Sequence, residues 1–361
     1  MSNPRKRSVI DMAVQPPEAP SSTGIPNFNV QINEDDGMAY MMDKKLPLGI
    51  ARKVISETEK CPMRFFIMDD SGSMSISDGS RLVEAGAGYA QVQCSRWEEM
   101  TSSAEFHLSL SKHLNAPCEF RFLNNLVPKR TGIRELDPDG VNDREIRKVL
   151  EWSPSGATPL CRHVTEVIHE IRAREKQIRE AGQHVSVVIM CDGSPSDGNI
   201  AQIMKPLEHL PCIVVVRLCT NDERIVDYWN NIDRQLEINL DILDDPIGEA
   251  FECKSSNPWL NYGHPLHRMR EWGVHIRELD FLDETLLTAT QMVNFLCILF
   301  DAKKADFPLP GVDYNEFEKV VQEKLRHLDQ IYNPVTRKLE PWINLSHLRR
   351  CYGPPGCCSV A

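Results

Sequence analysis

The chain has 361 residues and a formal net charge of −11, and 41% of its residues are hydrophobic and 26% charged. This length and composition allow one large or two small soluble domains with an ample hydrophobic core. The acidic balance argues against general nucleic-acid binding, which uses a basic surface, and the longest apolar stretch, Met292 to Phe300, is too short to span a bilayer.

The start of the chain and its cysteines bear on the cellular compartment. Residues 1–45 are rich in Pro, Ser, Asn and acidic groups without periodicity, which predicts a disordered arm. The charged residues 5–7 are followed by no sustained apolar run, so we expect no signal peptide. Cys191, Cys212 and Cys297 lie within apolar runs, which favours buried free thiols in a reducing compartment. A cytoplasmic protein is therefore expected.

The first chemical motif follows the apolar run from Met63 to Met68, which predicts a strand buried on both faces. Asp69, Ser71 and Ser73 come directly after it, with glycine between the two serines. A loop that presents only oxygen ligands suits a hard cation, magnesium before calcium, because few protein groups leave coordination positions for water. The alternative is a simple Gly-Ser turn after a strand.

Residues 76–93 predict a hairpin inserted between this loop and the next helix. At this position the hairpin would cover or reshape the rim of the loop that carries Asp69, Ser71 and Ser73. The further expected elements are, in chain order, helix 97–108, strand 118–123, helix 143–152, helix 158–181, strand 185–191, helix 199–210, strand 212–219, helix 223–235 and strand 238–243.

Two later segments supply oxygen atoms in the same way. Thr158 precedes Pro159 and an apolar stripe at helical spacing, which predicts a helix with Thr158 as its N-cap. Asp192 ends the apolar run that begins at Val185. Strands that alternate with helices predict an α/β fold with a doubly wound, mostly parallel sheet. Ligands bind such sheets at the carboxyl ends of the strands, where Asp69 and Asp192 would lie.

The pattern Asp-x-Ser-x-Ser, then Thr, then Asp resembles the metal-ion-dependent adhesion site of von Willebrand factor A (VWA) domains. The matching residues are Asp69, Ser71, Ser73, Thr158 and Asp192. The resemblance implies that the three hydroxyls contact the metal directly, Thr158 in the ligand-competent state, and that the two aspartates act through water. It implies Mg²⁺, with Mn²⁺ or Ca²⁺ as substitutes, and a VWA domain over residues 60–245. The hairpin departs from the family, in which the helix follows the first loop almost directly.

The rest of the chain divides into three expected parts. Residues 246–305 predict an extension packed on the VWA domain, including an apolar helix from 284 to 300. Residues 306–350 predict a helical tail, with a helix from 312 to 332 that docks on the domain or binds a partner helix. Residues 351–361 predict a flexible, cysteine-rich end.

The last four residues, 358–361, read Cys-Ser-Val-Ala and fit the C-a-a-X prenylation pattern. This tail resembles those of small membrane-anchored GTPases, which implies a prenyl group on Cys358. One lipid chain binds membranes only marginally, so Cys357 or Cys351 is a candidate for palmitoylation. The alternatives are an incidental cysteine-rich tail, or a metal site formed by His347 with the three cysteines.

These features predict a binding protein in place of an enzyme. Asp70 and Asp197 are the spare carboxylates near the loops, and we expect the first to point away from Asp69 and the second to cap the helix at Asn199. The expected function is a divalent-metal-dependent adaptor that captures an Asp or Glu carboxylate of a partner protein, peripheral on a membrane through its lipidated end. Copines resemble this arrangement but carry C2 domains upstream. The alternatives are a metal-dependent transferase or hydrolase, and a scaffold with a vestigial metal site.

Overall fold

The structure, a computed structural model, describes residues 31–85, 88–220 and 222–354. Its centre is a six-stranded sheet in the order β5-β4-β1-β6-β7-β8. The strands are β1 (Arg64–Met68), β4 (Cys118–Phe122), β5 (Lys129–Thr131), β6 (Val185–Cys191), β7 (Cys212–Leu218) and β8 (Leu240–Leu243). All neighbours pair in parallel except β4 with the edge strand β5. The predicted α/β, mostly parallel sheet is therefore confirmed.

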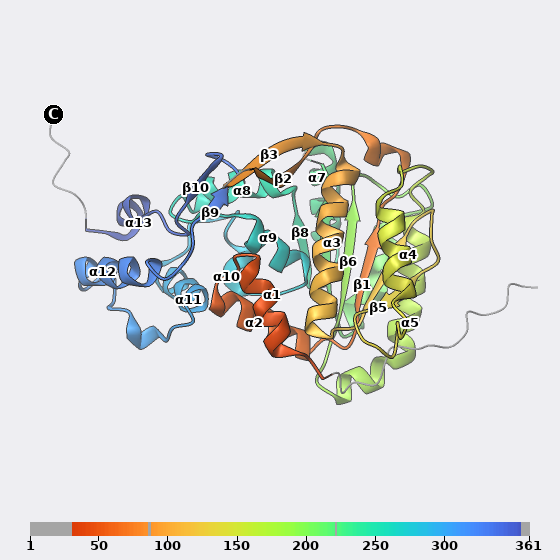
Figure 1. The fold of residues 1–361 in the computed structure, drawn as a ribbon, viewed down its shortest axis with the longest axis horizontal. Coiled ribbons are helices and arrows are strands. Elements are labelled where there is room, and N and C mark those ends of the chain that lie inside the picture. Colours follow the sequence, from red (N-terminus) through yellow and green to blue (C-terminus); the bar gives the residue numbers. More distant parts are fainter. Residues whose placement is uncertain (1–30, 86–87, 221, 355–361) are drawn as a thin grey trace, which may run out of the picture.

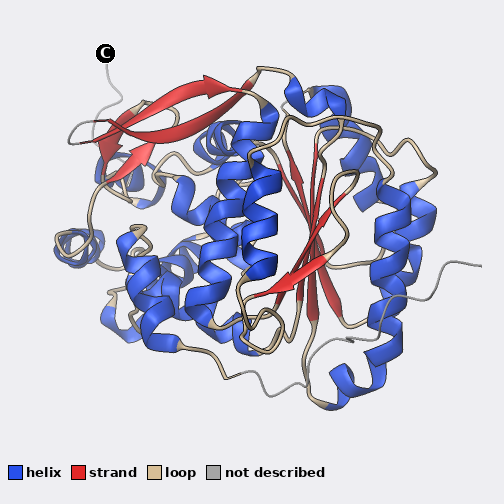
Figure 2. Ribbon diagram, turned by 45° about the vertical axis from the view of Figure 1, so that its right-hand side comes forward, coloured by secondary structure: helices blue, strands red, loops and turns tan. Residues whose placement is uncertain are grey.

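Helices cover both faces of the sheet (Figure 2). Successive residues of a strand point to opposite faces, so Phe65 and Ile67 of β1 lie in one core while Phe66 and Met68 lie in the other. The helices between the strands are α3 (Arg96–Leu114), α4 (Val141–Leu150), α5 (Leu160–Glu180), α6 (Ile200–Met204) and α7 (Glu223–Asp233). The helix expected over 199–210 becomes 3₁₀ from Lys205 to His209, because Pro206 cannot continue an α-helix.

The expectation of a disordered arm to residue 45 is wrong for its last part. Helix α1 spans Glu34–Asp43 and α2 spans Leu48–Glu59, both packed in the core on one face of the sheet. Asn33 caps α1 by accepting a hydrogen bond from the amide of Asp36. Gly37 of α1 lies directly against Leu114 at the end of α3, where an added Cβ would clash with the leucine. Residues 1–30 of the expected arm lie outside the described part of the chain.

The predicted hairpin is confirmed as β2 (Gly79–Ala85) paired with β3 (Gly88–Cys94). Figure 1 shows it running along the top of the molecule toward β9 and β10. The side chains of Leu82 and Tyr89 line a cavity together with Ile331 and Tyr332 of the C-terminal region. The hairpin therefore extends beyond the rim of the loop after β1 and reaches the C-terminal part of the chain.

The C-terminal region is more varied than the predicted helical tail. Its helices are α8 (Pro246–Ser256), α9 (His264–Glu271), α10 (Arg277–Asp280), α11 (Ala289–Leu299), α12 (Tyr314–Leu325) and α13 (Leu345–Tyr352), with a short 3₁₀ turn at Lys304–Asp306. Between α12 and α13 lies an unpredicted antiparallel pair, β9 (Ile331–Asn333) with β10 (Lys338–Glu340). Its strands have three residues each, too few for a visible alternation. Buried side chains of this region join the core on the face that α3 covers.

Two further expectations can be compared with the structure. None of the helices in the described part of the chain is long and apolar enough to cross a membrane. The ten cysteines between residues 61 and 351 are free thiols, among them Cys191, which is fully buried, and Cys212 and Cys297, which are only partly buried.

Candidate metal centre

The loop after β1 is held by the sheet itself. The amide of Asp69 donates to the carbonyl of Met190 on β6 (2.9 Å), so the pairing of the two strands continues to the first residue of the loop. Oδ1 of Asp69 then accepts the amide N–H of Ser71 (2.9 Å), and Gly72–Ser75 form a single 3₁₀ turn. The side chains of Asp69 and Ser71 are thereby fixed at the carboxyl end of β1, as the sequence predicts.

Hydrogen bonds connect this loop with the predicted aspartate after β6. The hydroxyls of Ser71 and Ser73 lie 3.1 Å apart, and Ser73 Oγ donates to Oδ1 of Asp192 (2.9 Å). A hydroxyl that donates its proton keeps two lone pairs free. Ser73 can therefore donate to Asp192 and still offer oxygen to a cation.

The segment that carries Thr158 lies against the first loop through its backbone. The amide of Gly72 donates to the carbonyl of Gly156 (3.2 Å), and the amide of Ser155 donates to the carbonyl of Asp70 (2.7 Å). The amide of Thr158 donates to Ser196 Oγ after β6 (3.1 Å). Within the described part of the chain, the Thr158 hydroxyl has no hydrogen-bond partner.

The helix cap differs from the prediction. Helix α5 begins at Leu160, with Pro159 at the N-cap position and no cap from its own side chain. Asp197 supplies the cap instead: its carboxylate accepts the amides of Cys161 (3.0 Å) and Arg162 (2.9 Å). The expectation that Thr158 caps this helix and that Asp197 caps the next one is therefore wrong, and Asn199 caps α6. Thr158 is left without a capping role.

Asp70 points away from Asp69, as expected, and holds a fourth loop. Its Oδ1 accepts the backbone and side-chain N–H groups of Asn124 (2.8 and 2.9 Å), and its Oδ2 accepts those of Asn125 (3.0 and 2.6 Å). Asn124 also donates to the carbonyl of Ala157 (2.9 Å). Asp70 therefore joins the loop after β4 to the segment before α5. The sequence contains no signal for this role, because the partners lie more than fifty positions away.

Arg96, at the first position of α3, is the residue that the sequence analysis missed. Its Nη1 donates to Oδ2 of Asp192 (2.9 Å), and its other nitrogens contact both carboxylate oxygens of Asp78 at the base of the hairpin. Hydrogen bonds to Asp78 and Asp192 raise the pKa of Arg96. One positive charge thus already lies beside Asp192. The inserted hairpin brings Asp78 to this position, which explains why spacing alone does not reveal the contact.

The polar groups of the site fit a hard cation. Oδ2 of Asp69 is buried and has no hydrogen-bond partner among the described residues, which is costly for a carboxylate. Burial raises the pKa of Asp69 to about 6, although hydrogen bonds from Ser71 oppose the rise, and the nearby charge of Asp192 adds to it. The hydroxyls of Ser71 and Ser73 lie on the same loop as Asp69, and the backbone of Thr158 contacts Ser196 in the loop that carries Asp192. This set contains only oxygen donors and two carboxylates, as magnesium prefers.

The structure thus joins four of the five predicted metal residues by hydrogen bonds, namely Asp69, Ser71, Ser73 and Asp192. It places the segment of Thr158 against them through Gly156 and Ser196. The predicted lipidation residues Cys357 and Cys358 lie outside the described residues, whereas Cys351 is half-buried in α13.

Comparison with known proteins yields distant structural similarity only. No protein-family model matches the chain, and no curated protein matches its sequence. Among solved structures, the chain is similar to the SpRpn10 VWA domain, with 9% sequence identity and a TM-score of 0.35 over 50% of this chain and 86% of that one. It is also similar to the conserved hypothetical protein BatB from Bacteroides thetaiotaomicron, with 12% identity and a TM-score of 0.36 over 58% and 98% of the two chains.

Proposed function

We propose that the chain is a VWA-type binding module that holds Mg²⁺ at the loops after β1 and β6 and captures an acidic group of a partner protein. The observation that carries this proposal is the buried, unpartnered Oδ2 of Asp69 beside the hydroxyls of Ser71 and Ser73. Mg²⁺ would be held by Ser71, Ser73 and Thr158, with Asp69 and Asp192 balancing its charge. When bound, the ion supplies an electrophilic position that accepts a carboxylate oxygen.

Binding is favoured over catalysis by the roles of the two spare carboxylates. Asp70 is fully buried and accepts four hydrogen bonds, and Asp197 caps α5 with both oxygens. A general base must have a free lone pair within reach of the substrate proton. Asp70 has its four lone-pair sites occupied, and Asp197 directs both oxygens at the amides that begin α5, so we assign neither a catalytic role.

Arg96 favours one alternative, a scaffold whose metal site is vestigial. Its guanidinium already compensates the charge of Asp192, which lowers the attraction of the site for a cation. The same positive charge would attract a carboxylate from a partner whether or not a metal is present. The experiment must therefore separate metal-dependent capture from capture by Arg96 alone.

The test uses serine-to-alanine variants within one loop. Ser71→Ala/Ser73→Ala removes two hydroxyls from the site, whereas the control Ser75→Ala removes an exposed hydroxyl that only contacts the carbonyl of Gly72. Titration calorimetry with Mg²⁺ and Mn²⁺ should show affinity at least ~10-fold weaker in the double variant, or about 1.4 kcal/mol. Ser75→Ala should bind the metal as the wild type does.

Capture of partners is measured with the same proteins. Pull-downs from cell lysate with Mg²⁺ should recover a partner with the wild type and Ser75→Ala, and lose it with the double variant or EDTA. Partners recovered equally in EDTA, but lost in Arg96→Met, would establish the vestigial-site alternative instead.

We also propose that the protein is cytoplasmic and held at a membrane by lipids on Cys358 and Cys357. The support is the C-a-a-X pattern of residues 358–361 and the cysteine directly before it. Two lipid chains provide stable anchoring where one does not. This part of the proposal is independent of the metal centre.

A further inference from the structure

A second acidic site lies at the carboxyl end of β8, the edge strand of the sheet. A cavity of about 500 Å³ opens there, and eight carboxylates are among the side chains that line it. Arg270 is the only arginine or lysine among the described residues of its lining. The wall of this cavity therefore carries a large excess of negative charge.

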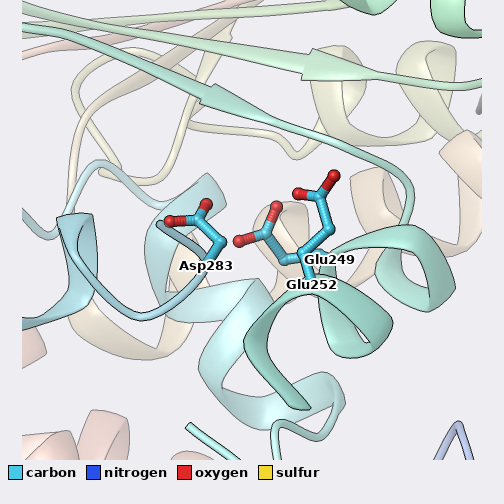
Figure 3. Close-up of side chains that lie close together, drawn as sticks. All are labelled: Glu249, Glu252 and Asp283. Carbon is cyan, nitrogen blue, oxygen red and sulfur yellow. The ribbon is translucent and has the colours of Figure 1, made fainter. Parts of the chain in front are cut away.

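Three of the carboxylates converge on one point (Figure 3). Glu249 and Glu252 lie three residues apart on α8, so they share one face of the helix. Asp283 approaches them from the segment between α10 and α11, and one oxygen from each of the three lies within 4.8 Å of the others. Ser256 at the end of α8 holds this segment by donating to the carbonyl of Asp283 (2.7 Å). The convergence is thus built into the backbone.

Arg270 compensates only part of this charge. Its guanidinium bonds to Glu249 and to Oδ1 of Asp241 (2.9 Å), and it lies 3.8 Å from Oδ2 of Asp283. Glu252 has no ion pair or hydrogen bond among the described residues. The one buried guanidinium of Arg270 therefore lies beside three carboxylates, and among the described residues it does not contact the fourth, Glu252.

Asp244 is a second, independent indication that this cavity is a ligand site. It directly follows β8, is only 9% exposed and lines the same cavity. Its carboxylate accepts no hydrogen bond and forms no ion pair with the described residues, in contrast to Asp245, which caps α8. Oδ1 of Asp283 is also buried and has no hydrogen-bond partner in the described part of the chain. Burial and the neighbouring carboxylates raise the pKa of Asp244 to about 7.

We infer that this cavity binds a divalent cation of the calcium class, with Glu249, Glu252 and Asp283 as ligands and Asp244 beside them. A set of carboxylates alone selects a hard cation, and calcium accepts more of them than magnesium does, in irregular geometry. Water in the cavity would complete the coordination. The cation would connect the end of β8, α8 and the segment at Asp283, three elements that otherwise repel one another here. No residue is shared with the site at Asp69.

The test is calorimetric titration of the full chain with CaCl₂, with MgCl₂ as comparison. Wild-type protein should bind Ca²⁺ more tightly than Mg²⁺ at this site. Glu252 is exposed, so Glu252→Gln should fold normally and bind Ca²⁺ at least ~10-fold more weakly. The control Glu223→Gln removes an equal charge from an exposed position on α7 and should bind Ca²⁺ as the wild type does.

Thermal unfolding distinguishes a bound ion from a general effect of surface charge. Without Ca²⁺, Glu252→Gln should have a Tm equal to or above that of the wild type, because it relieves repulsion. With a Ca²⁺ concentration well above the wild-type Kd the order should reverse, because the wild type gains more stability from the bound ion than the weaker-binding variant does. Asp283→Asn should show the same reversal of Tm order. It replaces Glu252→Gln as the test variant if Glu252→Gln does not fold.

Ser71→Ala/Ser73→Ala separates this site from the proposed metal centre, and it should retain Ca²⁺ binding. Loss of Ca²⁺ binding in that variant, with full binding in Glu252→Gln, would assign the signal to the loops at Asp69 and overturn the inference. The absence of Ca²⁺ binding in the wild type would overturn it as well, and would leave the proposed function intact.

Discussion

At the scale of single residues, neighbouring aspartates at the end of one strand have opposite roles. Asp69 has a buried oxygen with no hydrogen-bond partner among the residues that the structure describes, whereas both oxygens of Asp70 accept hydrogen bonds, four in all, from N–H groups. Consecutive residues of an extended chain point in opposite directions, so the two carboxylates face different loops. Asp69 can therefore interact with a ligand while Asp70 holds the surrounding loops in place.

We expect Asp70→Asn to destabilise the protein by about 2–4 kcal/mol, because an amide nitrogen would then face N–H donors and leave them unpaired. Urea unfolding followed by circular dichroism measures this cost. The matched control is Asp139→Asn, an exposed position, which should change the free energy of unfolding by less than about 0.5 kcal/mol. Equal stability of the two variants would contradict the structural role assigned to Asp70.

The four buried strands of the sheet were predictable from the sequence because burial on both faces leaves continuous apolar runs. Most of the interstrand helices were predictable from apolar residues at helical spacing, and the hairpin from two short strand-like runs around glycines. The spacing of Asp69, Ser71 and Ser73 likewise indicated the loop. Contacts between distant segments were not predictable: Arg96 pairs with Asp192 across ninety-six positions. Helix α1 was missed because it has ten residues and buries only Gly37 and Met41, so its amphipathic pattern is weak.

At the scale of elements, a buried polar network connects α3 with α9. Glu271 of α9 is fully buried and accepts hydrogen bonds from Ser103 (2.6 Å) and His107 (3.0 Å) of α3 and from Arg268 (2.7 Å). Burial alone would raise the pKa of Glu271, but Arg268 and the histidines hold it well below the ordinary range. The contact between these helices therefore depends on protonation.

This network predicts a dependence of stability on pH. Burial lowers the pKa values of His107 and His267 below 6.5, so these residues stay neutral in the fold while the unfolded chain takes up protons below that pH. Their contribution to stability is therefore complete above pH ~6.5 and decreases as pH falls, by up to about 1.4 kcal/mol per pH unit for each proton. At pH values below the ordinary pKa of a glutamate, the unfolded chain also takes up a proton at Glu271, which lowers the free energy of unfolding further.

His107→Gln tests this dependence, because glutamine can still donate to Glu271 but does not titrate. Its deficit in unfolding free energy relative to the wild type should shrink as pH is lowered from 7 to 5, by about 1–2 kcal/mol. His327→Gln, at a position that is 76% exposed, should change the pH profile far less. A constant difference between His107→Gln and the wild type across this range would refute the role of His107.

Among the larger contacts of the molecule, α13, the last helix of the described residues, is fixed to the rest of the C-terminal region. The hydroxyl of Tyr352 donates to the carbonyl of Leu287 (2.7 Å), and its ring packs edge-on against Trp259. The backbones of residues 259–261 and 342–344 also exchange hydrogen bonds. Helix α13 is therefore a part of the folded body up to its last residue.

The proposed membrane attachment can be tested by cell fractionation. Cys358→Ser should move the protein from the membrane fraction to the soluble fraction of cells, because the proposed prenyl group is lost. Cys357→Ser should do so in part, since one lipid chain binds only marginally. Ser359→Ala keeps both cysteines and should stay with the membrane. If Cys358→Ser fractionates like the wild type, prenylation is not the anchor.

The fixed position of Tyr352 limits the reach of such an anchor. Cys358 lies six positions after Tyr352, and an extended chain spans at most about 3.5 Å per position, or roughly 20 Å. Lipidated protein would therefore face the bilayer with α12 and α13, while the sheet, with α4 and α5, lies at the opposite end of the long axis (Figure 1). Attachment would then set orientation as well as location, and a partner would reach the loops at Asp69 from the side of the cytosol.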